Sequence, residues 1–275
     1  MGSLLWIASY PKSGNTWVRA FLTAYLRDEP VRLDDMEADT VASNRALFDE
    51  YAGVEAADLL PSEVSQLRPA IYAQLAAEST GMVLLKAHDP FRLPGGPPLF
   101  PPAVSRAIYI VRDPRDVAVS LAHHNNWTVE RAVDAVCHGY RAAPTGRALL
   151  DQLEQRLPAW SDHVRSWLEA AREVPLHVVR YEDLLADAPA HFAGLLDFYG
   201  AERDEARLTR AVDATRFERL RRQEAERGFQ ERPPRAVAFF RSGNTGQWAA
   251  VLPPALADRI AGSQAGLMRE LGYLP

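Results

Sequence analysis

An apolar run that stops at a tight polar turn, followed directly by a helical pattern, constrains this sequence most. The run Leu4–Ser9 has the length and residues of a buried strand, and the helical pattern begins near Thr16. A strand, a turn and a helix in this order point backbone N–H groups and the positive helix end at one place. The segment therefore predicts an anion site, with a P-loop-like strand–loop–helix, in an α/β fold.

Short apolar runs alternate with longer amphipathic runs along the rest of the chain, which predicts βα units and a mainly parallel sheet. The predicted strands are Leu4–Ser9, Met82–Lys86, Ala107–Val111 and Leu176–Arg180. The predicted helices are Thr16–Leu26, Pro114–His124, Arg147–Arg172, His191–Tyr199 and Pro254–Leu271. A chain of 275 residues, 47% of them hydrophobic, is long enough for one large α/β domain or two small ones. We expect a single domain over residues 1–275, with a central, mainly parallel sheet flanked by helices.

Three stretches stand apart from this alternation. Asp89–Pro102 is rich in Pro and Gly, and Gly228–Ala238 contains two prolines among charged residues, so both are predicted to be irregular loops. Loops of this length inside compact domains often serve as lids or binding loops. The acidic stretch Asp28–Gln66 is predicted to be helical and solvated.

Charge and cysteine content limit the class of protein. The formal net charge is −5, which makes the chain a poor candidate for non-specific nucleic-acid binding, so any bound anion must be held by a local cluster of donors. The single cysteine, Cys137, excludes an internal disulfide and fits a reducing compartment. The start of the chain lacks the charged region of a signal peptide, and its apolar run is too short for a membrane span. We therefore expect a cytoplasmic protein with no membrane span.

The turn after the first strand contains the donors that a phosphate group requires. Gly14 lets the backbone approach an anion closely, Lys12 supplies a positive charge, and Ser13 and Thr16 add hydroxyl groups. A nucleotide-triphosphate P-loop places its Lys directly before the Ser or Thr that opens the helix, whereas Lys12 stands at the head of the turn. For this cluster taken alone, an ordinary turn with a solvated lysine is the alternative.

A second cluster follows the predicted strand Ala107–Val111. Arg112 stands at the carboxyl end of that strand, where open α/β sheets bind ligands, and its planar guanidinium matches phosphate oxygens. Pro114 and Asp116 suit the start of a helix, and Ser120 lies one to two turns along it. The alternative is a surface cluster of Arg–Asp ion pairs, which stabilise a fold little.

A third cluster follows the strand Met82–Lys86. His88 stands just beyond it, and an unperturbed histidine is largely neutral near pH 7 and able to accept a proton. Lys86 adds a positive charge beside this candidate base. The sequence has seven histidines, most of which are expected to be structural. His123 and His124 are adjacent on one helix and point to different faces, so no metal site is expected there.

Taken in order, these motifs resemble those of sulfotransferases that use 3′-phosphoadenosine 5′-phosphosulfate (PAPS), both cytosolic enzymes and bacterial enzymes that modify antibiotics. Tyr10–Trp17 is similar to the family loop Y-P-K-S-G-T-T-W, from which only Asn15 departs. The resemblance implies that Lys12 holds the 5′-phosphate and the bridging oxygen, and that Trp17 lies near adenine. Lys86-Ala87-His88 is similar to the family's Lys-Thr-His base motif, which implies that His88 is the general base.

Later motifs extend the resemblance to Trp248. Phe240–Trp248 is similar to the late motif R-K-G-x-x-G-x-W, with Ser242 in place of the usual Lys. Tyr181 begins a Y-E-D segment, and Thr215-Arg216-Phe217 is similar to the stretch that touches adenine; for Tyr181 and Thr215, ordinary packing is the alternative. The resemblance also implies that Arg112 and Ser120 hold the 3′-phosphate. The predicted donor-binding residues are Lys12, Ser13, Gly14, Asn15, Thr16, Trp17, Arg112, Ser120, Tyr181, Thr215, Phe217, Arg241, Ser242 and Gly243.

The implied reaction is transfer of a sulfuryl group from PAPS to a hydroxyl of a small-molecule acceptor, a natural product by preference, without a metal. The residues expected to act on the reacting atoms are His88, Lys12 and Lys86, and 3′-phosphoadenosine 5′-phosphate (PAP) is the expected product. The loops Asp89–Pro102 and Gly228–Ala238 are expected to shape the acceptor pocket. Two alternatives are a nucleotide-dependent small-molecule kinase with an atypical P-loop and a non-catalytic nucleotide-binding module. The sequence does not determine the oligomeric state.

Overall fold

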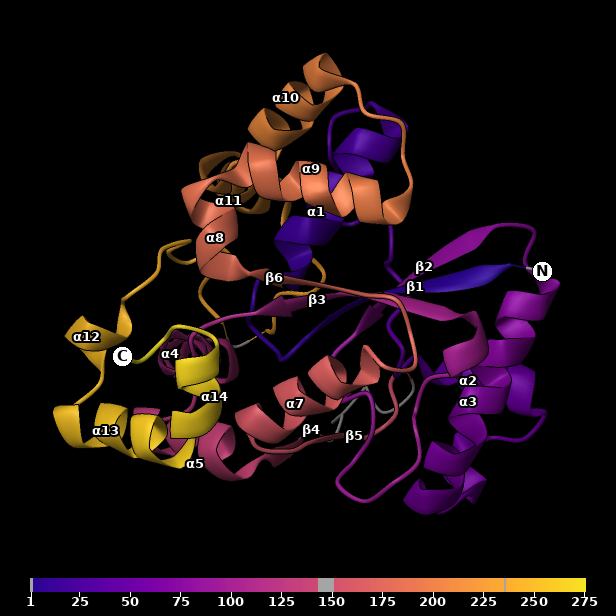
Figure 1. Cartoon of the computed structure of the whole chain (residues 1–275), viewed down its shortest axis with the longest axis horizontal. Helices are drawn as coiled ribbons and strands as arrows, with labels where there is room; N and C mark the ends of the chain where they lie inside the picture. The colour runs from indigo at the N-terminus through magenta and orange to yellow at the C-terminus, as the bar shows by residue number, and fades with distance from the viewer. Residues whose placement is uncertain (1, 143–150, 235) are drawn as a thin grey trace. The chain divides into compact units, whose positions relative to one another are not determined.

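The computed structural model describes residues 2–142, 151–234 and 236–275. Its fold is α/β, with a central sheet flanked by helices, as the alternation of apolar and amphipathic runs predicts (Figure 1). The sheet has the order β2–β1–β3–β6, and β1 and β2 pair in parallel with Leu5 opposite Leu84. Its strands are β1 (Ser3–Ser9), β2 (Met82–Ala87), β3 (Ser105–Val111) and β6 (Leu176–Arg180). All four predicted strands are confirmed, with ends that shift by no more than two residues.

Most of the predicted helices are confirmed, while several others were not predicted. The predicted helices correspond to α1 (Asn15–Arg27), α4 (Pro114–Asn125) and α9 (Ala188–Tyr199), and to the pair α13 (Pro254–Ser263) and α14 (Ala265–Glu270). Helix α7 (Trp160–Ala170) lies within the predicted helix Arg147–Arg172, and α2 (Arg45–Ala52) and the start of α3 (Pro61–Glu78) lie within the predicted helical stretch Asp28–Gln66. The helices of the described residues that were not predicted are α5 (Val129–His138), α8 (Tyr181–Ala186), α10 (Glu205–Ala214), α11 (Phe217–Arg227) and α12 (Trp248–Val251). Two short 3-10 helices are η1 (Ala56–Asp58) and η2 (Pro102–Val104).

The prediction of one helix over Arg147–Arg172 is wrong in part. Residues 147–150 lie outside the described residues, and Gln155–Leu157 forms the strand β5, which pairs antiparallel with β4 (Tyr140–Ala142). Gln155 and Leu157 are buried and Arg156 is exposed, so this segment follows the two-residue period of a strand. Helix α7 begins only after Pro158.

The prediction that Asp28–Gln66 is helical is also wrong in part, because no helix forms between residues 28 and 44. Here the chain folds back on α1, and the Arg27 guanidinium donates to the side chains of Asp35 and Glu37. The acidic residues Asp35 and Glu37 therefore fix a loop against α1 and do not form the solvated face of a helix.

The described residues form two compact units, each built from segments that are distant in sequence. Unit 1 contains the chain up to Tyr10 together with residues 38–109 and 138–178. Unit 2 contains residues 11–37, 110–137 and 179–275. The chain therefore passes from one unit to the other directly after β1, inside the turn that the sequence singles out.

Aromatic side chains form the core of unit 1. Trp6 of β1 lies with its ring centre 5.0 Å from that of Tyr72 on α3 and 4.6 Å from that of Phe100. The Trp6 indole N–H donates to the Ser105 hydroxyl at 2.9 Å, so its polar atom is satisfied inside the core. Trp167 of α7 stacks on Tyr109 of β3 at 5.8 Å, which fixes α7 against the sheet.

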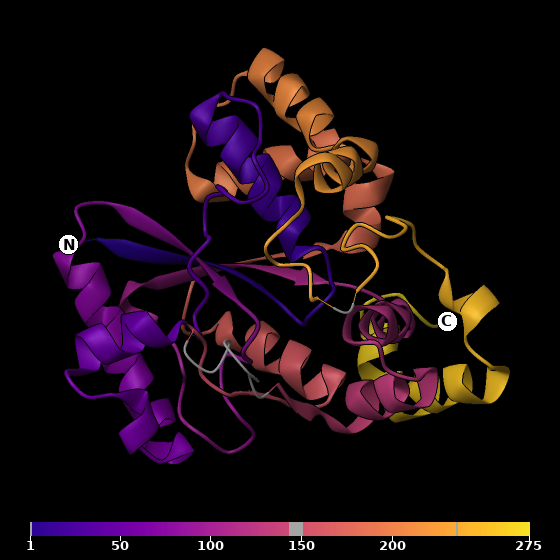
Figure 2. The ribbon, with the colours of Figure 1, turned by 180° about the vertical axis from the view of Figure 1, so that it is seen from behind.

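In unit 2, α1 is held by its neighbours α9 and α10. The ring of Phe21 stacks on that of Phe192 with centres 3.8 Å apart. The Tyr25 hydroxyl donates to the Glu202 carbonyl at 2.7 Å and accepts from the Asp204 N–H at 2.9 Å. Figure 2 shows α1 and α10 side by side, as Figure 1 does from the other side. These contacts fix the helix whose first turn ends the predicted anion loop.

A buried ion pair joins α3 to the residues that follow β2. The Arg68 guanidinium donates to both carboxylate oxygens of Asp89, at 2.9 Å and 3.0 Å, and the Gln155 amide donates to the same carboxylate at 3.1 Å. Burial is the largest influence on the pKa of Asp89 and would raise it. The charge of Arg68 and the hydrogen bonds from Arg68 and Gln155 together outweigh burial, so the pKa lies below its usual range. Asp89 therefore stays ionised inside unit 1.

The Arg68–Asp89 pair gives a prediction for stability. A carboxyl group whose pKa is lowered in the folded state stabilises the fold above the unfolded pKa, and this contribution is lost as the pH falls through the folded pKa. We expect the wild type to lose stability below about pH 4 more steeply than the double variant Arg68→Met/Asp89→Leu. At pH 7, Arg68→Met alone should lower the free energy of unfolding by about 3–5 kcal/mol, because it leaves a buried, unpaired carboxylate.

Urea unfolding at pH 7 and pH 3 measures both effects. The double variant is the matched control, since it removes both charges and leaves apolar side chains of similar size. An Arg68→Met variant as stable as the double variant at pH 7 would contradict the assignment of Asp89 as a buried anion.

Candidate active site

The turn between β1 and α1 has the backbone of an anion-binding loop. Lys12 has a φ of 70° and Gly14 a φ of 104°, both in the left-handed region that non-glycine residues rarely adopt. Successive residues that alternate in this way form a concave group of N–H donors. The Ser13 hydroxyl is buried and has no hydrogen-bond partner in the part of the chain that the structure describes. A buried donor without a partner is costly, and a phosphate oxygen would satisfy it.

Close packing explains two of the predicted glycines. A Cβ atom on Gly14 would lie 2.6 Å from Cδ2 of Tyr181, and a Cβ atom on Gly243 would collide with the ring of Phe217. Gly243 also has a positive φ, of 68°, and its carbonyl accepts a hydrogen bond of 3.1 Å from the Tyr181 hydroxyl. Unit 2 thus brings together Gly14, Tyr181, Phe217 and Gly243, which are separated by up to 229 residues in the sequence.

Arg112 connects the anion loop to the late motif of unit 2. Its guanidinium donates to the Lys12 carbonyl at 3.2 Å and to the Asn244 carbonyl at 2.9 Å. The same group lies 4.3 Å from the centre of the Tyr181 ring, within the range of a cation–π contact. Arg112 is buried, so its charge is placed close to the loop with little screening by solvent. Its role as a ligand of the 3′-phosphate stays a prediction.

Asp116 has a larger role than its place at a helix start indicates. Its carboxylate accepts from the backbone N–H groups of Gly246 at 2.7 Å and Trp248 at 3.0 Å, and lies 4.0 Å from the Arg112 guanidinium. The carboxylate therefore fixes the late motif and balances part of the charge of Arg112. The sequence indicates only a helix end for Asp116, because the partners that reveal its role lie about 130 residues further along the chain.

Further cationic and imidazole groups of unit 2 gather near this loop. Lys12 Nζ lies 3.1 Å from Nδ1 of His124 and 4.1 Å from the centre of the Phe239 ring. An ammonium group only donates, so Nδ1 of His124 accepts. Burial and then the charge of Arg112 lower the pKa of Arg241. Two guanidinium groups that repel each other in this way favour the binding of an anion between them.

The sequence contains a signal for His124 beyond the argument against a metal site. His124 lies four residues after Ser120 on α4, so the two residues share one face of that helix. Ser120 itself is half-buried. The contact of His124 with Lys12 thus falls beside a residue that the resemblance placed in the donor site.

Other predicted donor residues have different surroundings. The Trp17 ring lies edge-on to those of Tyr181, at 5.9 Å, and Phe192, at 5.5 Å. Thr215 is fully buried, and its hydroxyl donates to the Ala211 carbonyl at 2.9 Å, which favours a packing role at the end of α10. Asn15 and Thr16 are buried in the first turn of α1.

The candidate base lies in unit 1, directly after β2. Nδ1 of His88 is 3.0 Å from the carbonyl oxygen of Ser9 and 3.3 Å from its hydroxyl. A carbonyl oxygen only accepts, so Nδ1 of His88 carries the proton and the lone pair of the neutral ring is on Nε2. Lys86, also predicted to act, is half-buried on β2 and lies opposite Ile7 of β1.

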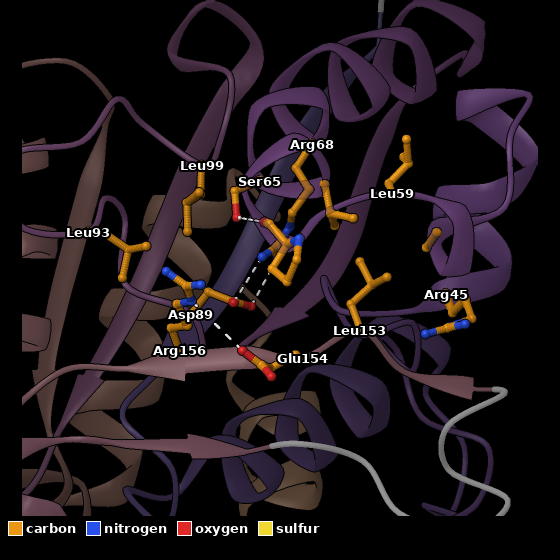
Figure 3. A pocket seen from close by; sticks show the side chains of 13 residues that line it. Arg45, Leu59, Ser65, Arg68, Asp89, Leu93, Leu99, Leu153, Glu154 and Arg156 are labelled. Carbon is orange, nitrogen blue, oxygen red and sulfur yellow. Dashed lines mark hydrogen bonds and ion pairs between the residues drawn. The ribbon is translucent and has the colours of Figure 1, made fainter.

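Unit 1 also contains a pocket of about 110 Å³. Figure 3 shows the Arg68–Asp89 pair on its wall, with Leu93 and Leu99 of the predicted loop Asp89–Pro102 beside it. Three arginines, the carboxylates of Asp89 and Glu154 and several apolar side chains line the pocket, so it offers apolar surface beside charges of both signs. Of the other predicted loop, Gly228–Ala238, residue 235 lies outside the described residues, and Phe229 packs edge-on against Phe239 at 4.8 Å.

Within residues 2–142, 151–234 and 236–275, no group of three or more His, Cys, Asp and Glu side chains is arranged to hold a metal ion. No helix within those ranges is long and apolar enough to cross a membrane.

Asp116 gives a prediction that does not depend on any ligand. Asp116→Asn replaces one acceptor oxygen by an NH₂ group, so the Gly246 and Trp248 amides cannot both keep their bonds, and the charge of Arg112 loses its counter-charge. We expect the free energy of unfolding to fall by about 1–3 kcal/mol and both amides to exchange hydrogen faster. Residue-resolved hydrogen exchange measures this. Asp113→Asn is the matched control, because Asp113 pairs with Arg115 instead; equal exchange at Gly246 in both variants would refute the role of Asp116.

Comparison with known proteins places the chain among sulfotransferases. It is 26% identical over 301 residues to cytosolic sulfotransferase 16 of Arabidopsis thaliana, covering 98% of this chain and 77% of that protein. It is 27% identical over 261 residues to sulfotransferase 1A1 of Bos taurus, covering 89% of this chain and 76% of that protein. Both relatives extend over nearly the whole chain, as the motifs do.

Solved structures share the fold. Retinol dehydratase in a complex with retinol and PAP superposes with a TM-score of 0.66 at 20% identity, covering 96% of this chain and 81% of that one. A mouse sulfotransferase complexed with PAP gives a TM-score of 0.60 at 18% identity, covering 97% and 85%. The family model of the sulfotransferase domain matches residues 3–271. The chain therefore belongs to the sulfotransferase family.

Proposed function

We propose that this chain transfers a sulfuryl group from PAPS to a hydroxyl of a small-molecule acceptor. The observation that carries the proposal is the left-handed loop of Lys12 and Gly14. Arg112 joins this loop to Asn244, and Tyr181, which packs against Gly14, donates to the Gly243 carbonyl. Two solved relatives contain PAP, the product that PAPS leaves after transfer. We further propose that both units act together as one domain.

The residues of unit 2 fit this nucleotide. The Ser13 hydroxyl, which has no hydrogen-bond partner among the described residues, and the concave loop suit the 5′-phosphosulfate. The charge of Lys12 and the start of α1 lie beside them. Arg112 and Arg241, whose charges repel each other, suit the 3′-phosphate. Ser120, Ser242 and Gly243 would complete that part of the site, and Trp17, Thr215 and Phe217 would lie toward adenine.

Bound PAPS would supply the sulfuryl group and a good leaving group, the 5′-phosphate. Lys12 would exchange its contact with His124 for the phosphate oxygens and neutralise the charge that develops there. The N–H groups at the start of α1 would add to this stabilisation without reorganising. Positioning and electrostatics would thus provide most of the rate, as in phosphoryl transfer.

His88 would accept the proton of the acceptor hydroxyl on Nε2. Its Nδ1–H group donates to the Ser9 carbonyl, which holds the ring and stabilises the imidazolium that forms. Lys86 would neutralise part of the negative charge on the sulfuryl group during its transfer. This pair of roles assigns proton transfer to unit 1 and donor binding to unit 2.

The acceptor in this proposal is a natural product or another small molecule with a hydroxyl group. The pocket of unit 1 supports it, because the predicted loop Asp89–Pro102 contributes Leu93 and Leu99 to the lining. A structural relative binds retinol, a small apolar alcohol. We also propose a cytoplasmic location, which the relatives named cytosolic sulfotransferases support.

Calorimetric titration with PAP, ADP and ATP, each with and without Mg²⁺, tests the donor class. We expect PAP to bind without Mg²⁺ and ADP to bind about 10- to 100-fold more weakly, because it lacks the 3′-phosphate. Gly14→Ala should weaken PAP about 10-fold or more, since its Cβ meets Tyr181 and its φ is strained. Preference for ATP with Mg²⁺ would overturn the proposal in favour of a kinase.

Gly200→Ala is the matched control for this titration. Gly200 has a φ of 90°, and a Cβ atom there meets no atom within 4 Å, so the variant carries similar backbone strain away from the loop. Its PAP affinity should equal that of the wild type. Equal losses in both variants would mean that strain, and not the loop, weakens binding.

The role of His88 gives a separate prediction. His88→Asn keeps a donor for the Ser9 carbonyl but cannot take a proton, so turnover of PAPS with a phenol panel should fall about 10²- to 10⁴-fold. PAP affinity should stay unchanged, because the residues proposed to hold PAP belong to unit 2. His191→Asn, on α9, is the control. If His88→Asn keeps wild-type turnover, His88 is not the base. That result would not affect the proposal for donor binding.

A further inference from the structure

The residues that begin with His88 are fixed to one face of α7. The His88 carbonyl accepts from Nε2 of His163 at 3.0 Å, and the Asp89 carbonyl accepts from the Trp167 indole at 3.0 Å. The Phe91 N–H donates to the Ser166 hydroxyl at 3.1 Å. His163, Ser166 and Trp167 are three and four residues apart, so they share one face of the helix. All of these residues belong to unit 1.

His163 is held in one tautomer. The His88 carbonyl only accepts, so Nε2 of His163 carries the proton, and Nδ1 accepts from the Tyr109 hydroxyl at 2.9 Å. Burial lowers the pKa of His163 to about 4, and burial raises the pKa of Tyr109 well above its usual value. Both groups are therefore neutral near pH 7, and the hydrogen bonds run in one direction from β3 through α7 to His88.

The side chain of Asp89 fixes the same segment from α3. Its carboxylate accepts two hydrogen bonds from Arg68 and one from Gln155, and Figure 3 shows the Arg68–Asp89 pair on the pocket wall. The Arg68 Nε–H donates in turn to the Tyr72 hydroxyl at 2.9 Å. The segment just after β2 is thus held at two successive residues. Side chains of α7 donate to the carbonyls of His88 and Asp89, and Arg68 of α3 donates to the Asp89 carboxylate.

We propose that His163 is a positioning residue for His88, with Trp167 and the Arg68–Asp89 pair in support. The proposal rests on the role of His88 as the base. His88 points Nδ1–H at the Ser9 carbonyl only while its own backbone stays in place, and His163 is the side chain that holds its carbonyl. By holding this carbonyl, the hydrogen bond from His163 selects the tautomer of the His88 ring in which Nδ1 carries the proton and Nε2 can accept one.

The size of the effect follows from geometry. A displacement of about 1 Å at a reacting group can cost about 10²-fold in rate. His163→Leu removes both hydrogen bonds of the imidazole at similar volume, so the His88 carbonyl loses this donor and the Tyr109 hydroxyl loses this acceptor. Turnover of PAPS with the phenol panel should then fall about 10- to 100-fold, while PAP affinity stays within about twofold. His163→Gln keeps an N–H donor near the position of Nε2 and should recover most of the turnover.

Nitrogen NMR of the imidazole groups tests the proposal without an acceptor. The ring-nitrogen signals of His88 are identified because they disappear in His88→Asn. They are measured at a pH high enough for the ring to be neutral, so that its tautomer can be determined. We expect a single Nδ1–H tautomer in the wild type, a mixture of tautomers in His163→Leu, and the single tautomer again in His163→Gln. Tyr109→Phe is the milder variant if His163→Leu does not fold, and it should give an intermediate mixture, because His163 then loses the donor that fixes its own tautomer.

One outcome overturns the proposal. If His163→Leu, or Tyr109→Phe in its place, lowers the Tm while the His88 tautomer stays as in the wild type, His163 serves stability alone. This result is distinguishable from failure of the proposed function, since wild-type turnover in His88→Asn would show that His88 is not the base whatever its tautomer.

Discussion

The buried charge of Arg112 is the interaction on which the donor side of the site depends. A guanidinium taken out of water needs compensation, and here it comes from the carbonyls of Lys12 and Asn244, the ring of Tyr181 and the nearby carboxylate of Asp116. These partners come from four separate parts of unit 2. Because all four surround one cation, Arg112 joins the loops that would meet the nucleotide and is also the residue proposed to bind it.

The same arrangement leaves unit 2 with more positive than negative charge at this place. Lys12 and Arg241 lie near the loop as well, and the pKa of Arg241 is lowered by burial and by Arg112. A fold that gathers cations in this way is less stable without an anion than with one, so binding and local stability are linked. The contact of Lys12 with His124 limits this cost, since Nδ1 of the imidazole accepts a hydrogen bond from the ammonium group.

Local sequence patterns predicted the sheet and the anion loop. The features that they did not predict depend on contacts between residues that are distant in sequence. The strands were evident because both faces of each are largely apolar, as in β1 and β3. Helix α11 was missed because charged residues cover most of it, and one of its few buried side chains, Glu224, accepts from the N–H groups of Phe239 and Phe240. The role of Asp116 was missed because its partners, the N–H groups of Gly246 and Trp248, are distant in sequence.

Three histidines show why a candidate site cannot be completed from residue types. His88, His124 and His163 are chemically identical in a sequence, yet each is given a different role by the group that faces its ring nitrogens. A carbonyl opposite Nδ1 leaves the lone pair of His88 on Nε2, whereas a carbonyl opposite Nε2 and a phenol opposite Nδ1 leave His163 no available lone pair. The environment thus separates a group that can take a proton from one that can only hold its neighbour, and this distinction exists only in the fold.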